Sequence, residues 1–343
     1  MPRSAPQFWQ GRGLLAWLWL PLAGLFYLIA QGRRRAYQAG WLRVERLSVP
    51  VVVVGNLAAG GSGKTPVVAW LVEVLRRAGY QPGIVSRGYG GQVAGTALVG
   101  PRDDPARCGD EPVLLASLTG CPVAVGADRP AAARLLLASH PGCDVIISDD
   151  GLQHYRLGRE VEIAVVDEVV LGNQLPLPAG PLREPLRRLA EVDLVIANGP
   201  LSAALGAQAA TVPVRSMTLR GEEFLNLAVP ERRVGAAAFA GRRVHGVAGI
   251  GRPERFFQQL ESMGLTVERH PFPDHHPFRP EDLAFAPGEP KILTAKDGVK
   301  CARFATPDLW VFPVRAEIGA TTDSGIAADH LILEKLRHGP PIA

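Results

Sequence analysis

A glycine-rich segment at residues 55–65 contains the residue types that bind phosphate groups. It follows the β-branched run 51–54 and precedes residues 66–78, whose composition is helical. Glycines let backbone N–H groups turn toward phosphate oxygens, a lysine adds positive charge, and a threonine at a helix N-terminus offers a hydroxyl to magnesium. This pattern predicts a nucleotide phosphate-binding loop (P-loop), although Ala58 stands where the strict motif has glycine. The predicted ATP-binding residues are Gly60, Gly61, Ser62, Gly63, Lys64 and Thr65.

Two adjacent carboxylates follow a second apolar run. Residues 145–148 predict a buried strand, and Asp149 and Asp150 come directly after it. Carboxylates at the carboxyl end of a parallel strand can hold Mg²⁺, with the Thr65 hydroxyl opposite them. Alone, Asp-Asp-Gly is typical of a turn. Together with the P-loop it predicts an enzyme that hydrolyses ATP or transfers its phosphate with Mg²⁺, and either aspartate can be the direct ligand.

The elements that must position these groups alternate along the chain. From residue 41 onward, β-branched runs alternate with helical stretches, which is typical of a parallel sheet with helices on both faces. The alternation restarts at residue 242. The predicted strands are 51–54, 83–86, 122–125, 143–148, 161–166, 194–197, 243–248, 265–270, 291–294 and 309–314, and the predicted helices are 66–78, 111–118, 130–139, 253–263 and 326–336.

The predicted fold class is therefore α/β, with a P-loop NTPase sheet and a second, smaller α/β lobe. The predicted domains are an N-terminal membrane anchor over 1–40, the P-loop domain over 41–235, the second lobe over 236–325 and a closing C-terminal helix over 326–343. The closing helix could pack on either lobe.

The first 40 residues contain the most apolar stretch of the chain. Residues 14–30 carry no charge and precede an arginine cluster at 33–35. A secretory signal fits worst, because no cleavage site follows and the basic cluster lies on the wrong side. A transmembrane helix and a buried core helix stay open, but Pro21, Gly24 and the tryptophans favour a helix lying in the membrane interface. Either membrane interpretation leaves the rest of the chain in the cytoplasm by the positive-inside rule.

Composition argues against several classes of protein. Of 343 residues, 47% are hydrophobic and 20% are charged, which is not typical of disorder. A net charge of +4 is too balanced for a dedicated nucleic-acid binder, and no obligate protein partner is inferred. The four cysteines form no Cys-x-x-Cys pair and predict reduced thiols. His270, His275 and His276 have no neighbouring cysteine that would indicate zinc.

Three classes of P-loop protein are excluded by missing signatures. The chain lacks the Leu-Ser-Gly-Gly-Gln sequence of transporter ATPases. Residues 294–297 have the wrong spacing for a guanine-binding motif, and Ala59 replaces the extra lysine of partition ATPases. The remaining classes include kinases.

Seven short motifs together resemble one enzyme family, the tetraacyldisaccharide 4'-kinases, over nearly the whole chain. The motifs are Val-Gly-Asn-Leu (54–57), Gly-Gly-Ser-Gly-Lys-Thr-Pro (60–66), Ser-Arg-Gly-Tyr-Gly (86–90), Gly-Asp-Glu-Pro (109–112), Asp-Asp-Gly-Leu-Gln-His (149–154), Pro-Ala-Gly-Pro-Leu-Arg-Glu-Pro (178–185) and Phe-Pro-Asp-His-His-Pro-Phe (272–278). The sequence departs from the family pattern at Leu152, where an aromatic is expected, and at Ala295 and Gly298. Ala295 argues against a carboxylate role at that position.

The resemblance implies transfer of the ATP γ-phosphoryl group to the 4'-hydroxyl of a tetraacyldisaccharide 1-phosphate in lipid A biosynthesis. The partners would then be an anionic acylated disaccharide lipid and a membrane surface, at the cytoplasmic face of the bacterial inner membrane. The residues alone leave a second hypothesis open, a membrane-associated regulatory P-loop ATPase without a small-molecule acceptor.

The resemblance also implies a catalytic dyad, Asp110 and His275, acting beside Lys64. These two residues come from different predicted lobes and would meet only when the lobes close. From the residues alone, Asp110 could be a simple helix N-cap and His275 a surface histidine, and the spacing does not exclude His276. Residues expected to contact the lipid or its phosphates are Arg87, Tyr89, Glu111, Arg129, Gln153, His154 and Arg183.

Overall fold

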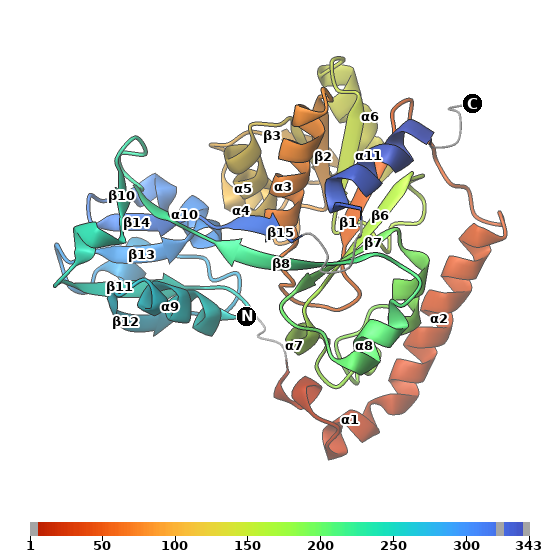
Figure 1. Cartoon of the computed structure of the whole chain (residues 1–343), viewed down its shortest axis with the longest axis horizontal. Helices are drawn as coiled ribbons and strands as arrows, with labels where there is room; N and C mark the ends of the chain where they lie inside the picture. The colour runs from red at the N-terminus through yellow and green to blue at the C-terminus, as the bar shows by residue number, and fades with distance from the viewer. Residues whose placement is uncertain (1–5, 320–325, 339–343) are drawn as a thin grey trace.

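The computed structural model describes residues 6–319 and 326–338, which form two α/β lobes (Figure 1). The strands of the first lobe are β1 (Val51–Gly55), β2 (Pro82–Ser86), β3 (Thr96–Val99), β4 (Val123–Gly126), β5 (Val145–Asp149), β6 (Val161–Val166), β7 (Leu194–Asn198), β8 (Val214–Arg220) and β15 (Arg315–Ile318). They form one sheet in the order β15-β8-β7-β6-β1-β5-β2-β4-β3. The seven strands from β8 to β4 are parallel, and an antiparallel strand closes each edge.

Helices cover both faces of this sheet, which confirms the predicted α/β class. The four valines of β1 alternate between two cores: Val52 and Val54 face one, and Val51 and Val53 face the other. The first core is covered by α3 (Lys64–Arg77), α5 (Asp110–Thr119) and α11 (Ala328–His338), and the second by α6 (Arg129–Ser139) and α8 (Ala203–Gln208). Two short helices, α4 (Pro105–Cys108) and α7 (Glu168–Leu171), lie in connections. The closing helix α11 thus packs on the first lobe, where Ile332 is buried.

The second lobe is a smaller sheet with its own core. Its elements are β9 (Glu223–Asn226), β10 (Arg233–Gly235), β11 (Arg243–Ala248), α9 (Pro253–Ser262), β12 (Thr266–Pro271), β13 (Lys291–Thr294), α10 (Ala295–Cys301) and β14 (Leu309–Phe312). The strand order is β10-β9-β14-β13-β11-β12, with β12 at one edge. Aromatic side chains fill the core on the α9 side, where Phe224 stacks on Phe312 and Phe257 is fully buried.

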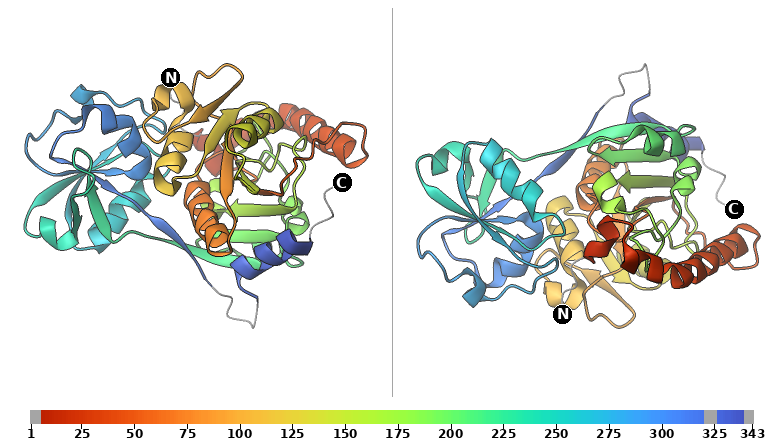
Figure 2. Two further views of the ribbon diagram at one scale, coloured as in Figure 1. Left: turned by 90° about the horizontal axis from the view of Figure 1, so that it is seen from above. Right: turned by 90° about the horizontal axis from the view of Figure 1, so that it is seen from below.

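The strand pairing differs from the predicted domain boundaries. β9 and β10 lie within residues 41–235, predicted as the P-loop domain, but pair within the second sheet, whereas β15 returns to pair with β8 at the edge of the first sheet. The chain therefore changes lobes after β8 and again before β15, and these two strands form the antiparallel ribbon that joins the lobes (Figure 2). Gly221 lies at the first crossing, where an added Cβ would come within 2.3 Å of the Phe312 ring, so the close approach requires glycine.

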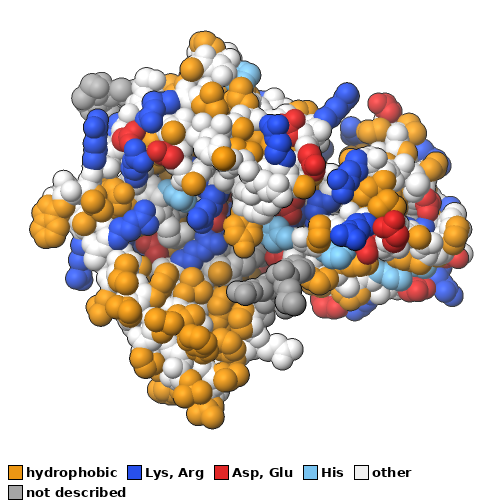
Figure 3. Space-filling view, turned by 180° about the vertical axis from the view of Figure 1, so that it is seen from behind, with side chains coloured by type: hydrophobic (Ala, Val, Ile, Leu, Met, Phe, Trp, Pro, Cys, Tyr) orange, Lys and Arg blue, Asp and Glu red, His pale blue; other side chains and the backbone are white. Residues whose placement is uncertain are grey.

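The N-terminal segment forms two helices, α1 (Leu14–Leu18) and α2 (Leu20–Gln38), along one side of the first lobe (Figure 1). Within residues 6–319 and 326–338, none of the helices combines the length and the apolar character needed to cross a membrane. Hydrophobic side chains nevertheless gather on the surface at this end of the molecule (Figure 3). The exposed ones of α1 and α2 are Leu14, Leu15, Trp17, Leu18, Leu22, Leu25, Leu28 and Ile29, here called the N-terminal apolar surface.

Candidate active site

The predicted P-loop connects the carboxyl end of β1 to the first turn of α3. Gly63 adopts a φ of 91° and directly precedes Lys64, the first residue of the helix. A Cβ at Gly63 would lie 2.7 Å from Nδ2 of Asn198, so this position excludes larger residues. Two asparagine side chains hold the loop: Asn56 donates to the Gly60 carbonyl (3.2 Å) and Asn198 donates to the Ser62 carbonyl (2.9 Å). The six predicted ATP-binding residues therefore lie in one loop and one helix N-terminus, an arrangement suited to anions.

Asp150 is the member of the acidic pair that contacts two cationic side chains. It follows β5 with a φ of 49°, and its carboxylate contacts Lys64 Nζ (3.5 Å) and accepts from Arg183 Nη1 (2.8 Å). Burial alone would raise the pKa of Asp150, but Lys64 and Arg183 outweigh burial and hold this pKa below its usual value. The contact with Lys64 brings the end of β5 to the P-loop, as the sequence predicts.

Asp149, the last residue of β5, has a buried carboxylate oxygen without a partner among the described residues. Its Oδ2 accepts from Ser86 Oγ (2.9 Å), while its buried Oδ1 has neither a hydrogen bond nor an ion pair among the described residues; Asp150 Oδ1 also lacks a hydrogen bond but faces Lys64 Nζ at 3.5 Å. Burial, together with the charges of Glu111 and Asp150, raises the pKa of Asp149 to about 7. A buried carboxylate oxygen without a donor costs free energy unless a proton or a metal ion binds it. The donor set at this strand end therefore fits Mg²⁺.

Asp110 and His275 meet across the two lobes. His275 Nδ1 is 2.9 Å from Asp110 Oδ2, so the imidazole N–H donates to the carboxylate. Asp110 is the first residue of α5 and only 6% exposed, and the residue at the N-cap is Gly109, so Asp110 is not the cap. His276 instead contacts Asp282 (2.9 Å) within its own lobe. The geometry selects His275 over His276 as the partner of Asp110.

The charges around the pair keep Asp110 ionised and make His275 more basic. The hydrogen bond that His275 donates to Asp110 raises the pKa of His275, although burial and Lys296 oppose this. Burial would raise the pKa of Asp110, but His275 and Lys296 lower it below its usual value. With Nδ1–H directed at Asp110, the remaining nitrogen, Nε2, carries the basic lone pair of the neutral ring.

Lys296 is a member of this site that the sequence did not predict. Its Nζ lies 3.2 Å from His275 Nε2 and 3.3 Å from Glu111 Oε1. It also lies 3.6 Å from Asp274 and 3.8 Å from Asp110. The side chain is 17% exposed, so its ammonium is held among three carboxylates and one imidazole. Lys296 lies in residues 294–298, a segment that the family resemblance covers, and only that resemblance could have indicated it from the sequence.

Two arginines of the second lobe reach the P-loop side of the first lobe, and these contacts were also not predicted. Arg255 donates to Asp167 (3.0 Å) and to Asn198 Oδ1 (2.9 Å), while Arg252 pairs with the same Asp167. Since Asn198 also holds Ser62, the second lobe is linked to the P-loop through one side chain. Asp167 and Asn198 stand at the carboxyl ends of β6 and β7, the sheet edge where α/β proteins bind ligands. Their position at the ends of two predicted strands is the feature of the sequence that could have indicated Asp167 and Asn198.

Of the predicted substrate residues, Gln153 contacts the start of the P-loop, and His154 follows it in the chain. Gln153 Nε2 donates to the Asn56 carbonyl (3.0 Å) and to Glu184 (2.9 Å). Burial, aided by the charges of Arg129 and Arg87, lowers the pKa of His154 to about 3. His154 is therefore neutral at physiological pH and can act as a hydrogen-bonding group, not as a cation.

The other predicted substrate residues occupy different environments. Arg129 is 1% exposed, and its guanidinium donates to the carbonyls of Gly126 (2.8 Å) and Asp149 (3.2 Å), so it fixes the end of β5 and is not exposed to a ligand. Tyr89 is exposed, with its ring 5.5 Å from the His275 ring. Arg87 directly follows β2 and is exposed. Arg183 contacts Asp150, and Glu111 contacts Lys296.

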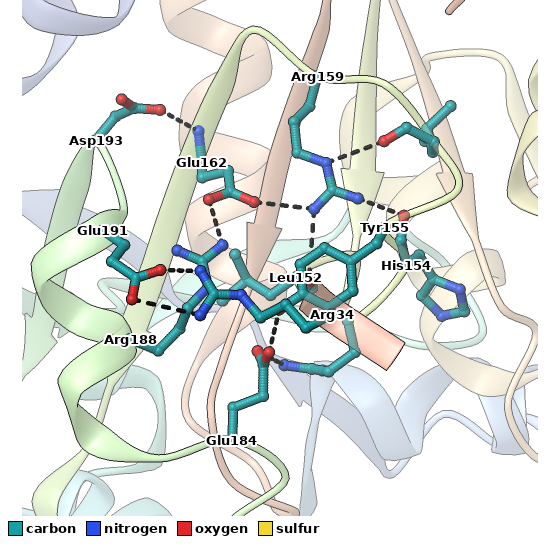
Figure 4. Close-up of polar contacts among 12 residues, drawn as sticks. Arg34, Leu152, His154, Tyr155, Arg159, Glu162, Glu184, Arg188, Glu191 and Asp193 are labelled. Carbon is teal, nitrogen blue, oxygen red and sulfur yellow. Dashed lines mark hydrogen bonds and ion pairs between the residues drawn. The ribbon is translucent and has the colours of Figure 1, made fainter. Parts of the chain in front are cut away.

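A polar network holds the 151–157 segment, which includes Gln153 and His154 (Figure 4). Arg159 donates to the carbonyls of His154 and Leu152 and contacts Glu162, which also accepts from the buried Arg188. Tyr155 donates to Glu184. Leu152 stands where the family pattern has an aromatic residue, and it is fully buried. Its side chain packs against Gly55, where an added Cβ would lie 2.8 Å from Leu152 Cγ. The polar contacts connect the segment to Glu162 of β6 and to Glu184.

Comparisons with known proteins show which family the chain belongs to. A family model described as tetraacyldisaccharide-1-P 4'-kinase matches residues 15–332. A protein named tetraacyldisaccharide 4'-kinase from Aromatoleum aromaticum (strain DSM 19018 / LMG 30748 / EbN1) is 63% identical over 343 residues, covering 100% of both chains. One of the same name from Azoarcus sp. (strain BH72) is 60% identical and covers 99% of this chain and 97% of its own.

A solved structure shows the same fold. The crystal structure described as the "apo" form of LpxK from Aquifex aeolicus in complex with ATP aligns with a TM-score of 0.78 and 28% identity, covering 94% of this chain and 100% of that one. These matches confirm the resemblance inferred from the seven motifs. The chain belongs to the tetraacyldisaccharide 4'-kinase family of ATP-dependent transferases in lipid A biosynthesis.

Proposed function

We propose that the two lobes of this lipid A 4'-kinase divide the reaction between them: the first lobe binds Mg-ATP, and the second supplies His275 to activate the acceptor hydroxyl. The observation that carries the proposal is the contact between His275 and Asp110, 2.9 Å across the lobes. Both residues belong to the lobes' facing edges, and the second lobe also reaches the P-loop through Arg255 and Asn198. The site is thus assembled by both lobes.

The first lobe would bind the ATP phosphates at the N-terminus of α3. Lys64 supplies a positive charge beside Asp150, and the loop N–H groups supply hydrogen bonds. Asp149, Asp150 and Thr65 would hold Mg²⁺, which neutralises charge on the phosphates when it is bound. Oδ1 of both aspartates lacks a hydrogen bond among the described residues, but Asp150 Oδ1 contacts Lys64 Nζ whereas Asp149 Oδ1 has no ion-pair partner there, which makes Asp149 the better candidate for direct coordination.

The acceptor hydroxyl would be activated by the Asp110–His275 pair. Asp110 fixes the ring with Nδ1 protonated, so Nε2 is the nitrogen that can take the hydroxyl proton. Nε2 is now capped by Lys296 Nζ at 3.2 Å. The bound hydroxyl would displace this ammonium, which keeps Glu111 and Asp274 as partners. The oxygen then attacks the γ-phosphorus as ADP leaves, and the proton stays on Nε2 until release.

The direct test is acceptor-dependent transfer. Purified protein with γ-labelled ATP, Mg²⁺ and tetraacyldisaccharide 1-phosphate should place one label at the 4' position, and ATP consumption without acceptor should be slow by comparison. The regulatory ATPase hypothesis predicts equal ATP consumption with and without the lipid, and that result would contradict the proposal. The same lipid with the 4'-hydroxyl blocked is the matched control.

We also propose that the N-terminal apolar surface binds the cytoplasmic face of the inner membrane as an interfacial helix pair. Eight exposed hydrophobic side chains lie on two consecutive helices, next to the exposed Arg33 and Arg35. Arg34, expected with them at the lipid surface, instead turns inward and pairs with Glu191. This ion pair connects α2 to the first lobe. The ring centroid of Tyr37 in α2 also lies 6.1 Å from that of Tyr155, the residue that follows His154 in the chain. An acceptor lipid in the membrane would reach the site along this side.

Charged substitutions on this surface should release the protein from membranes. Leu18→Glu with Leu28→Glu should weaken binding to vesicles of anionic phospholipid on the order of tenfold or more, because two apolar side chains no longer leave water. The control is Val229→Glu with Ile326→Glu, two other exposed apolar residues outside α1 and α2. Co-sedimentation measures both variants. Equal binding by the Leu18/Leu28 variant and the unmodified protein would assign the membrane contact to another surface.

A further inference from the structure

Two histidines and a glutamate converge at the edge of the second sheet, away from the residues assigned to ATP and lipid. His245 of β11 pairs in register with Glu268 of β12, and His270 follows two residues later on the same face of β12. His245 Nδ1 lies 3.0 Å from His270 Nε2 and 3.9 Å from Glu268 Oε2. His270 Nε2 lies 3.6 Å from Glu268 Oε1. One ligand atom of each residue thus faces the same small volume.

A second carboxylate orients the buried histidine. Glu289 Oε2 lies 3.1 Å from His245 Nε2, so Nε2–H donates to this carboxylate and the Nδ1 lone pair points toward His270 and Glu268. Histidines that bind metals usually donate their other ring N–H to a carboxylate or carbonyl in this way. Phe285 stacks on the His270 ring, with centroids 4.2 Å apart and planes inclined by 19°, and fixes the orientation of the second ligand.

The spacing of the three ligand atoms suits a tetrahedral metal ion. Zinc bonds to nitrogen and oxygen ligands of about 2.0–2.2 Å at tetrahedral angles place neighbouring ligands roughly 3.3–3.6 Å apart. The observed separations bracket that range: 3.0 Å between the two histidine nitrogens, 3.6 Å from His270 Nε2 to Glu268 Oε1, and 3.9 Å from His245 Nδ1 to the other Glu268 oxygen, Oε2. We propose that His245, Glu268 and His270 bind one divalent transition-metal ion of the zinc class, with water as the fourth ligand.

The donor set separates this site from the magnesium residues. Mg²⁺ prefers oxygen ligands, whereas imidazole nitrogens favour zinc, cobalt and nickel. Two nearby cations do not block the site: Lys291 pairs with Asp308, and the Arg243 contact with Glu268 (3.2 Å) is exposed and is exchanged at little cost.

A metal ion here would join the edge strand β12 to β11. β12 continues directly into the turn that carries His275, so the ion would stabilise the strand that positions one half of the catalytic pair. Binding to the folded state alone stabilises a protein in proportion to the logarithm of ligand concentration, so zinc should raise the melting temperature.

Zinc binding by the full-length protein tests the site. With excess Mg²⁺ present to occupy the oxygen-ligand sites, competition with a chromophoric chelator should show one equivalent of Zn²⁺ more on the unmodified protein than on His270→Gln or Glu268→Gln. Both substitutions are at partly exposed positions and preserve side-chain size, and the amide introduced by His270→Gln can keep the hydrogen bond to His245. Glu289→Gln should retain the ion with affinity lowered on the order of ten- to a hundredfold.

The control is His140→Gln, which removes an exposed histidine elsewhere and should bind Zn²⁺ as the unmodified protein does. Co²⁺ gives a second measurement, because tetrahedral coordination produces visible absorption bands that His270→Gln should lose. Equal Zn²⁺ equivalents and equal Co²⁺ spectra for the unmodified protein and His270→Gln would overturn the proposal, and the cluster would then be a hydrogen-bonded seam only.

Discussion

Replacing Lys64 with alanine should lower kcat/KM for ATP by about a hundredfold or more. The transition state of phosphoryl transfer spreads charge over the phosphate oxygens, and one fixed cation at this position is worth several kcal/mol. The fold should survive the change, because Asp150 keeps its contact with Arg183 at 2.8 Å when the Lys64 contact at 3.5 Å is lost.

Steady-state assays of Lys64→Ala with both substrates varied measure this effect. Lys335→Ala is the matched control, since Lys335 is an exposed lysine of α11 that pairs with Asp193. Thermal unfolding should show a similar melting temperature for both variants. Near-normal kcat/KM in Lys64→Ala would mean that the loop does not bind the transferred phosphate.

Replacing His275 with alanine should lower kcat on the order of a hundred- to ten-thousandfold, the range that a positioned general base contributes. Nucleotide affinity should change little, because His275 lies with Asp110 and Lys296 and not in the P-loop. His276→Ala is the control, since His276 pairs with Asp282 in its own lobe. Turnover and ATP binding of both variants are the measurements, and a greater loss of turnover in His276→Ala would mean that His276, not His275, is the base.

The pH dependence gives the same residue a second signature. A base must be neutral to accept a proton, so kcat/KM should rise with pH as His275 loses its proton. Asp110 raises the pKa of His275, and Asp110→Asn removes that cause. The rising limb of the kcat/KM profile should therefore move to lower pH in Asp110→Asn, while the maximum kcat/KM at high pH falls. If the limb does not move, the group that titrates there is not His275.

Local sequence patterns predicted the elements of the fold well. The β-branched runs became β1, β2, β4 to β7, β11, β13 and β14, because parallel strands buried on both faces must be apolar along their whole length. Local patterns do not show which of the two sheets a strand joins. β8 and β15 pair over a separation of about one hundred residues, and only the folded chain shows that both belong to the first sheet.

The site shows the same division. Lys64, Asp150, Asp110 and His275 were predicted from motifs, and the structure places them in two contacts, Lys64 with Asp150 and Asp110 with His275. Lys296, Asn198 and Arg255 were missed because their partners are distant in sequence. Arg129 was predicted to contact the lipid or its phosphates because an arginine fork matches phosphate oxygens, and only the packing shows that its guanidinium donates to two backbone carbonyls. His245 approaches His270 through strand register, which residue spacing does not reveal.

The central claim is that Asp110 and His275 act as one unit supplied by two lobes. The most direct test is the single-turnover rate of phosphoryl transfer for His275→Ala, Asp110→Ala and the double variant, each saturated with Mg-ATP and acceptor lipid. Groups that act as a unit lose their effect together. The account predicts that the double variant is scarcely slower than the slower single variant. Losses that multiply, so that the double variant shows the product of the two single effects, would contradict it and assign the two residues independent roles.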